Sequence, residues 1–303
     1  MSKPLWIALE QDRLLAVTGP DREKFLQGQT TTDFREVTPD VSRLGCVCNL
    51  KGRAIFSYRA INWRDTLWLL MDATLHERAR LHLQKYIIFS KATLETPAVR
   101  AWGLIGPGSA ALVREITGLD TQGVDTVAAN DRITAVSLGN DRYLLLLEDD
   151  EHGNAVAARF AQAAAAGAVN DWRLAQIRAG EAQIVADSAE IFQPQEINYP
   201  ALNGVSYNKG CYTGQEIVAR LYFRGKLKQW THRFSAPLTE CPAPNATLQH
   251  ADGSSAGHVV MAARSEEGIE MLAVVKHDAL EGLNLNGVPV TAQSLPYTVL
   301  PRD

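Results

Sequence analysis

The chain has 303 residues, of which 46% are hydrophobic and 21% are charged, a composition typical of a soluble globular protein. Its length suits two or three packed units better than one small core. The net charge of −4 argues against a body built to coat nucleic acid or an anionic membrane, and no run approaches the roughly 18 apolar residues that span a bilayer.

The first half of the chain contains a weak internal repeat. Each copy has the pattern of a strand, a Gly-Pro turn, a helix, a second strand and a second helix. We predict the first copy at residues 14–20, 22–27, 66–71 and 75–86, and the second at 102–107, 109–116, 143–147 and 155–165. This order predicts an α+β fold with two lobes of similar build, which ferredoxin-like units would satisfy.

The cysteines bear on the compartment. Four of them, Cys46, Cys48, Cys211 and Cys241, are too few and too scattered for a disulfide framework in a chain of this length. No long apolar segment follows the N-terminus, so we expect no secretory signal, free thiols and a cytoplasmic location. The C-x-C pair at 46 and 48 has two interpretations, a soft-metal or redox pair and two small buried residues. The second is favoured because free cysteine is among the most buried residue types.

Residues 171–225 have a different texture. A helix is predicted at 172–179 and is ended by Gly180. A loop rich in Pro, Gln and Asn follows at 193–203, and long loops inside compact domains are usually functional or disordered. The aromatic and aliphatic residues of this loop favour an ordered one.

The C-terminal part reads as a small all-β unit. Strands are predicted at residues 231–237, 246–250, 257–263, 268–275 and 288–292. Short strands separated by turn signals of this kind predict a Greek-key β-barrel. We therefore expect domains at 1–97, 98–227 and 228–303, with the chain crossing between the two lobes near 171–225.

The most informative motif covers residues 209–216. Thr213 and Glu216 have the spacing of a capping box, which places Cys211 at, or just outside, a helix N-terminus. The positive end of that helix and the Lys209 ammonium would both favour a thiolate over a thiol. The alternative is a small buried residue at a strand–helix junction, and the neighbouring lysine and glycines favour a reactive cysteine.

Two further features each have a functional and an ordinary interpretation. A local basic cluster would be an anion site for phosphate or a polyglutamate tail, or else a solvated face; it consists of Arg220, Arg224, Lys226, Lys228, His232 and Arg233. Glu196, in a loop fixed by proline, could accept two hydrogen bonds from an amino-pyrimidinone edge such as a pterin, or could be an exposed loop residue. The seven histidines show no metal-ligand spacing, and we expect no metal site.

The motif at 209–216, continued by residues 218–220 and 223–225, resembles the signature of the YgfZ family. These are folate-binding proteins related to the T-protein, the aminomethyltransferase of the glycine cleavage system. The resemblance also touches residues 21–30, 51–53, 172–180 and 192–198. It implies a three-part ring with a central tetrahydrofolate site and a C-terminal barrel. It also implies a role in the maintenance of iron–sulfur enzymes, including those that thiolate tRNA.

The resemblance assigns roles to individual residues. Cys211 matches the cysteine that the family requires, with Lys209 beside it. The residues expected at the folate are Glu196, which matches the carboxylate that holds the pterin, together with Trp172, Asn198, Tyr212 and Arg224. One departure concerns residues 54–57, where T-proteins carry a catalytic carboxylate and this chain has none. A plain aminomethyltransferase is therefore not expected, because that transfer needs the carboxylate for acid–base and electrostatic work.

Three functional hypotheses follow. The first is a folate-binding accessory protein in iron–sulfur cluster assembly or repair, with iron–sulfur enzymes or assembly proteins as clients and no membrane. The second is a folate-dependent one-carbon transferase with a substrate other than glycine. The third, direct tRNA binding through the basic cluster, is the least favoured because the chain is acidic overall.

Overall fold

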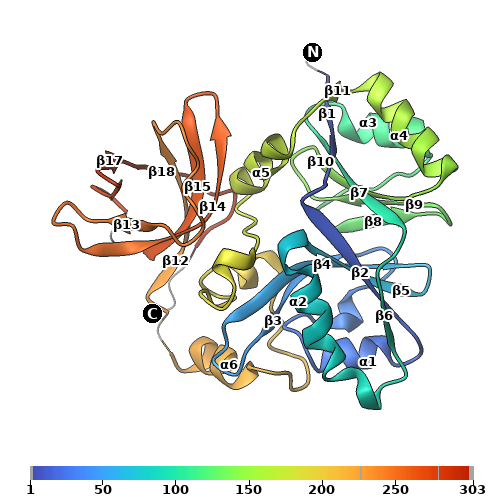
Figure 1. Ribbon diagram of the computed structural model, residues 1–303, viewed down its shortest axis with the longest axis horizontal. Coiled ribbons are helices and arrows are strands. Elements are labelled where there is room, and N and C mark those ends of the chain that lie inside the picture. The colour runs from blue at the N-terminus through green and yellow to red at the C-terminus, as the bar shows by residue number, and fades with distance from the viewer. Residues whose placement is uncertain (1–2, 226, 279, 300–303) are drawn as a thin grey trace. The chain divides into compact units, whose positions relative to one another are not determined.

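The computed structural model describes residues 3–225, 227–278 and 280–299 (Figure 1). Its contacts divide the chain into two compact units. The first contains the described residues up to Gln29 together with 33–44 and 58–172. The second contains 30–32, 45–57 and the described residues from Arg173 onward. The predicted domain limits at 97 and 227 stay predictions.

One six-stranded sheet of the first unit has the order β11-β1-β7-β10-β9-β8 among the described residues. Its strands are β1 (Leu5–Ala8), β7 (Val99–Ile105), β8 (Thr126–Ala129), β9 (Ile133–Ser137), β10 (Arg142–Glu148) and β11 (Ala165–Ala166). Helices α3 (Ser109–Thr117) and α4 (Glu151–Ala163) pack on it. Strand β10 is buried on both faces because alternate residues belong to different cores, Leu145 beside Phe160 of α4 and Leu144 beside Trp172.

The other sheet has five strands in the described residues, in the order β3-β4-β5-β2-β6. The strands are β2 (Asp12–Thr18), β3 (Arg43–Cys48), β4 (Ala54–Trp63), β5 (Thr66–Asp72) and β6 (Thr93–Glu95). Its helices are α1 (Arg22–Gln27), η1 (Phe34–Glu36), α2 (Ala73–Gln84) and η2 (Ile87–Phe89). Strands β3 and β4 are divided between the two units, so the turn that joins them belongs to the second.

Most predicted helices are confirmed, with shifts of a few residues at both ends. The helix at 22–27 has the predicted limits. Helix α2 begins at Ala73, because the Asp72 carboxylate accepts a hydrogen bond from the Thr74 amide. Helix α4 likewise begins at Glu151 rather than 155, because Asp150 caps it through the Gly153 amide. The prediction missed β1, β4, β6 and the β8–β9 hairpin.

The second unit joins an irregular segment to a barrel (Figure 1). Helix α5 (Val169–Arg178) leads into it, followed by η3 (Ala186–Ser188), η4 (Tyr199–Leu202) and α6 (Gln215–Phe223). The barrel strands are β12 (Gln229–Ala236), β13 (Thr247–Gln249), β14 (Ser255–Ser265), β15 (Gly268–Lys276), β16 (Asn284–Leu285), β17 (Val288–Pro289) and β18 (Thr291–Gln293).

The barrel is a nearly closed antiparallel sheet, with seven strands among the described residues in the order β17-β16-β13-β14-β15-β12-β18. Strand β12 pairs with β15 instead of with the next strand of the chain. This return of the fourth strand to the first is the Greek-key connection that the sequence predicts. Phe234, Val259 and Met271 fill the interior. No helix in the described ranges has the length and apolar character needed to cross a membrane.

Candidate functional site

Cys211 is exposed on the loop that precedes α6. The capping box predicted from Thr213 and Glu216 is wrong, because the N-cap of α6 is Gly214. Gly214 has φ +83°, a left-handed conformation that glycine adopts without strain. The Gln215 side chain instead reaches back and accepts a hydrogen bond from the Tyr212 amide at 3.3 Å. Cys211 therefore lies in the loop before the N-cap of α6. The effect of the helix end on the reactivity of its thiol stays a prediction.

Lys209 is buried beneath this loop, 9% exposed. Its Nζ donates to the carbonyl oxygens of Thr30, at 2.7 Å, and Thr32, and lies 5.1 Å from the centre of the Tyr212 ring. A buried ammonium needs such acceptors to offset its desolvation. The predicted effect of Lys209 on the pKa of Cys211 stays a prediction, and the structure adds an anchoring contact that the sequence did not indicate.

The other end of the loop is fixed by close packing on the turn between β3 and β4. A Cβ on Gly214 would lie 2.4 Å from the Asn49 carbonyl oxygen and 3.0 Å from the Cys48 Cβ. Gly52, with φ +70°, lies so close to α6 that a Cβ there would be 3.0 Å from Ile217. The motif is thus held on both sides of Cys211, by an ammonium before it and by a glycine contact after it.

Cys46 and Cys48 are fully buried in β3. Burial raises the pKa of the Cys48 thiol to about 12 and that of Cys46 well above its ordinary value. The interpretation as two small buried residues is confirmed. No group of three or more His, Cys, Asp or Glu side chains in the described part of the chain could hold a metal ion.

Glu196 is half-buried in the irregular segment, between η3 and η4. Its two carboxylate oxygens accept hydrogen bonds from the Gln193 amide and from Gln229 Nε2, both at 2.8 Å. Its own carbonyl oxygen accepts from the amide of Thr231. The carboxylate is held in one orientation by these bonds, which use two of its roughly four acceptor positions.

The other residues predicted to bind folate lie in different surroundings. Asn198 is buried with φ +59°, and its Nδ2 donates to the Thr231 carbonyl oxygen at 2.7 Å. Tyr212 is buried beside Lys209, and Arg224 is exposed just after α6. Trp172 is 3% exposed in the core of the first unit, so close to Gly103 that a Cβ there would lie 2.5 Å from its ring.

The described residues of the predicted basic cluster do not all lie on the protein surface. Its exposed members are Arg220, Arg224 and Lys228. His232 is 8% exposed, and burial, together with the charge of His277, lowers its pKa to about 4. Arg233 lies 3.9 Å from the Glu270 carboxylate, and Lys226 lies outside the described residues. A smaller exposed group of three cations therefore remains.

Comparisons with known proteins agree with this fold. No model of a known protein family matches the chain. The chain is 30% identical over 305 residues to the tRNA-modifying protein YgfZ of Yersinia pseudotuberculosis, covering 97% of this chain and 92% of that one. It is 29% identical to the protein of the same name from Escherichia coli, with the same coverage.

A solved structure is also similar. The glycine cleavage system aminomethyltransferase T from Bartonella henselae matches with a TM-score of 0.78 and 15% identity, over 97% of this chain and 86% of that chain. At this identity the likeness shows the fold alone, so the chain has a T-protein-like fold.

Proposed function

Because the chain belongs to the YgfZ family, we propose that it is a folate-binding accessory protein of iron–sulfur cluster assembly or repair. Through that role it would support tRNA modification, which agrees with the name of its relatives, tRNA-modifying protein YgfZ. The Cys211 thiol would contact the client, an iron–sulfur enzyme or assembly protein, and tetrahydrofolate would bind near Glu196. Direct binding of tRNA is not needed for this role.

The observation that carries the proposal is the construction of the loop around Cys211. The chain buries an ammonium at Lys209 and brings two backbones together at Gly214, while the thiol between these positions is exposed. Free cysteine is usually buried, so a rigid support under an exposed one favours a functional thiol. Cys46 and Cys48 show the contrasting case of buried cysteines in the same chain.

Glu196 supports the folate part of the proposal. A carboxylate with its orientation fixed by Gln193 and Gln229 is ready to accept further hydrogen bonds without a loss of side-chain entropy. The amino and ring N–H groups of a pterin are donors of the kind that a carboxylate binds well. Trp172, Asn198, Tyr212 and Arg224 stay predicted contacts.

The thiol is tested in cells that lack the native gene. Cys211→Ser should fail to restore the activities of iron–sulfur enzymes, and Cys241→Ser should restore them. Cys241 is the matched control because it is also exposed and free but lies outside the motif. Restoration by Cys211→Ser to the level of the native chain would contradict the proposal.

Folate binding is tested on the purified protein by calorimetric titration with tetrahydrofolate. Glu196→Gln should weaken binding at least about tenfold, since a charged acceptor is lost. Glu216→Gln, an exposed carboxylate on α6, should leave it unchanged. Equal affinities of the two variants would remove Glu196 from the folate site, and the absence of binding by the native chain would refute the folate proposal.

The competing hypothesis of a one-carbon transferase is distinguished by turnover. Residues Ala54, Ile55 and Phe56 are buried at the start of β4, and no carboxylate stands at this point of the chain. Purified protein should therefore leave methyl- and methylene-folates unconverted. Catalytic conversion of either compound would favour the transferase.

A further inference from the structure

Exposed apolar side chains of the first unit gather at one turn. Among the described residues, four of the five large apolar side chains that this unit exposes lie between positions 81 and 89: Leu81, Tyr86, Ile88 and Phe89, the fifth being Val124. The turn is η2 with its N-cap Tyr86, and it connects α2 to β6 (Figure 1). Phe89 is 98% exposed and Ile88 72%. Two successive side chains are this exposed only where the backbone itself projects from the surface. We call Tyr86, Ile88 and Phe89 the apolar tip.

The turn that carries the apolar tip is ordered. Ile87, between the exposed residues, is buried, and its carbonyl oxygen accepts a hydrogen bond from the Ser90 amide at 2.8 Å. The Lys91 amide donates to the Asp21 carboxylate at 2.8 Å, and the Lys91 carbonyl oxygen accepts from the Asp21 amide. Apolar side chains that an ordered turn holds in water indicate a surface that binds an apolar partner.

The chain around the apolar tip is basic, although the whole chain carries a net charge of −4. Residues 78–94 contain no carboxylate side chain, and their cations are Arg78, Arg80, Lys85 and Lys91. Arg80 is paired with Glu77 at 2.8 Å. Lys85 and Lys91 are both exposed, one directly before the tip and one two positions after it. Apolar side chains flanked by cations are complementary to a partner with an apolar interior and a negatively charged surface.

We propose that the apolar tip and its two flanking lysines dock on an anionic lipid surface. Phe89 and Ile88 enter the boundary between headgroups and acyl chains. Lys85 and Lys91 place their ammonium groups at the lipid phosphates, while their methylene stems extend along the apolar layer. Tyr86, with an apolar ring and a polar end, suits the depth of the headgroups. Because few side chains enter the lipid, the association is peripheral and reversible.

The composition of the tip favours lipid over protein or RNA as the partner. Lysine is depleted in protein interfaces, where an anchoring side chain is usually surrounded by a rim of further contacts. Single-stranded RNA stacks on aromatic faces, which Ile88 and Leu81 do not offer. The tip belongs to the first unit, whereas Cys211 and Glu196 belong to the second, so this inference does not rest on the proposed function.

Flotation of the full-length protein with lipid vesicles tests the docking. One set of vesicles contains equal parts of phosphatidylglycerol and phosphatidylcholine, and the other contains phosphatidylcholine alone. Affinity for the anionic vesicles should be at least about tenfold higher, because each lysine near an anionic surface contributes to binding. This preference should disappear at about 1 M NaCl, where the Debye length falls to about 3 Å.

Substitutions separate the apolar contribution from the charged one. Phe89→Ser should weaken binding to the anionic vesicles at least about tenfold, because a ring no longer enters the apolar layer. Phe89→Trp should bind at least as strongly as the native chain, since tryptophan is enriched at membrane interfaces. Lys85→Gln combined with Lys91→Gln should weaken binding about tenfold and remove the preference for anionic lipid.

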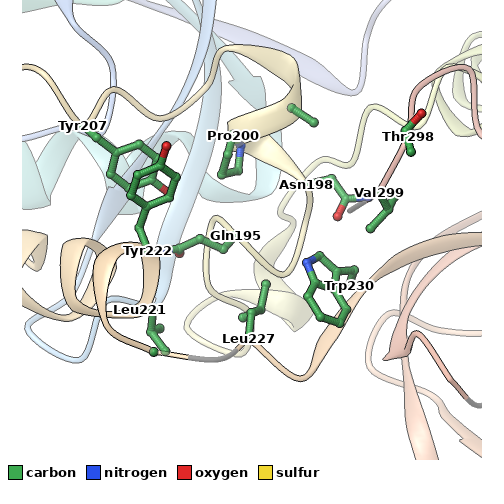
Figure 2. Close-up of a pocket in the computed structure, with 12 residues that line it drawn as sticks. Gln195, Asn198, Pro200, Tyr207, Leu221, Tyr222, Leu227, Trp230, Thr298 and Val299 are labelled. Carbon is green, nitrogen blue, oxygen red and sulfur yellow. The ribbon is translucent and has the colours of Figure 1, made fainter. Parts of the chain in front are cut away.

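Phe223→Ser is the matched control, because Phe223 is also an exposed phenylalanine but belongs to the second unit. Its ring packs edge-on against Tyr222, which stacks on Tyr207 with ring centres 3.5 Å apart (Figure 2). This substitution should leave vesicle binding unchanged. Thermal unfolding of each variant checks that the fold is kept, which we expect for Phe89→Ser because its ring is almost fully exposed.

Three results would overturn the proposal. The first is a native chain that does not float with anionic vesicles. The second is a Phe89→Ser variant that floats as the native chain does, which would reduce vesicle binding to a general attraction of cations. The third is a loss of binding in Phe223→Ser as large as in Phe89→Ser. If the native chain bound no vesicles and Phe89→Ser failed to restore iron–sulfur enzyme activities in cells, the tip would dock on a protein instead of on lipid.

Discussion

The ammonium of Lys209 donates a hydrogen bond to the carbonyl oxygen of Thr30, 179 positions earlier in the chain, at 2.7 Å. A second bond to Thr32 makes the same ammonium a bridge between two carbonyls. The lysine thus ties the loop of Cys211 to an N-terminal segment of the same unit. From the sequence, Lys209 is predicted to activate the Cys211 thiol. In the fold, Lys209 anchors the backbone of the loop that carries Cys211.

Replacing this anchor should loosen the loop. Lys209→Met removes the charged donor from both carbonyls and should lower the free energy of unfolding by about 3 kcal/mol, measured by urea denaturation. The exposed Lys228→Met should change it by less than about 0.5 kcal/mol. Equal stabilities of the two variants would show that the Lys209 contacts contribute nothing.

Two glycines of the motif should respond differently to alanine. Gly214→Ala combines a left-handed φ with a contact at 2.4 Å to the Asn49 carbonyl oxygen, and should cost at least about 1–2 kcal/mol. Gly210→Ala meets nothing within 4 Å and should stay within about 0.5 kcal/mol of the native chain. Thermal unfolding of the two variants gives the comparison, and a tolerated Gly214→Ala would contradict the packing described for the β3–β4 turn.

The cysteines should fall into two classes when a thiol reagent is added to the native protein. Cys211 and Cys241 are exposed and should react in the native state, Cys241 more slowly because partial burial raises its pKa. The buried Cys46 and Cys48, whose pKa values are also raised by burial, should react only after unfolding. With a reagent that releases a chromophore on reaction with a thiol, the absorbance gives the number of thiols that have reacted. The Cys241→Ser variant isolates Cys211, and rapid labelling of a third thiol in the native state would disprove this assignment.

His232 should make the protein less stable in mild acid. Burial lowers its pKa to about 4, so between about 6.5 and 4 the unfolded chain binds a proton that the folded chain does not. The contribution of His232 to stability is present above that range and is lost as pH falls through it. In His232→Gln, the urea midpoint should depend less on pH across this window than in the native chain. A difference in slope that grew instead below pH 4 would exclude His232 as the cause.

A buried ion pair supports the first unit. Arg59 Nη1 lies 2.5 Å from Asp125 Oδ1, and both residues are 6% exposed. Asp125→Asn keeps the shape and tolerates the φ of +65°, but it removes the negative charge that lies against a buried guanidinium and should cost about 3–5 kcal/mol. Asp120→Asn, which breaks an exposed pair with Arg114, should cost less than about 1 kcal/mol. Chemical denaturation of the two variants measures the difference.

Local patterns made the helices and the barrel predictable. Apolar spacing located the helix at 22–27, and turn signals located the strands of the C-terminal unit. Strand pairing was less accessible: β1 pairs with β7, across nearly 100 residues, and no residue type announces such a partner. The hydrophobic pattern of a strand fixes which of its faces is buried, but the choice of a distant partner strand depends on tertiary packing.

The candidate site was predictable in its residues but not in their contacts. Lys209 donates to the backbone carbonyls of Thr30 and Thr32. Because every residue type has such a carbonyl, the sequence could not indicate these contacts. The capping prediction failed because a left-handed Gly214 begins the helix. For His232 the sequence did contain a signal. His232, Phe234 and Ala236 are spaced two residues apart, so they share one face of β12, and this face is buried. The spacing argues against counting His232 with the surface cations.

The division of strands β3 and β4 between the units bears on how the chain matures. Thr30–Thr32 and residues 45–57 belong to the second unit, whose remainder begins at Arg173. A chain emerging from the ribosome would therefore carry these early segments for more than a hundred residues before their native neighbours are synthesised. Contacts of such large sequence separation slow folding and prolong the exposure of apolar strands. A fragment that starts at Arg173 would lack residues 30–32 and 45–57, on which the loop of Cys211 packs.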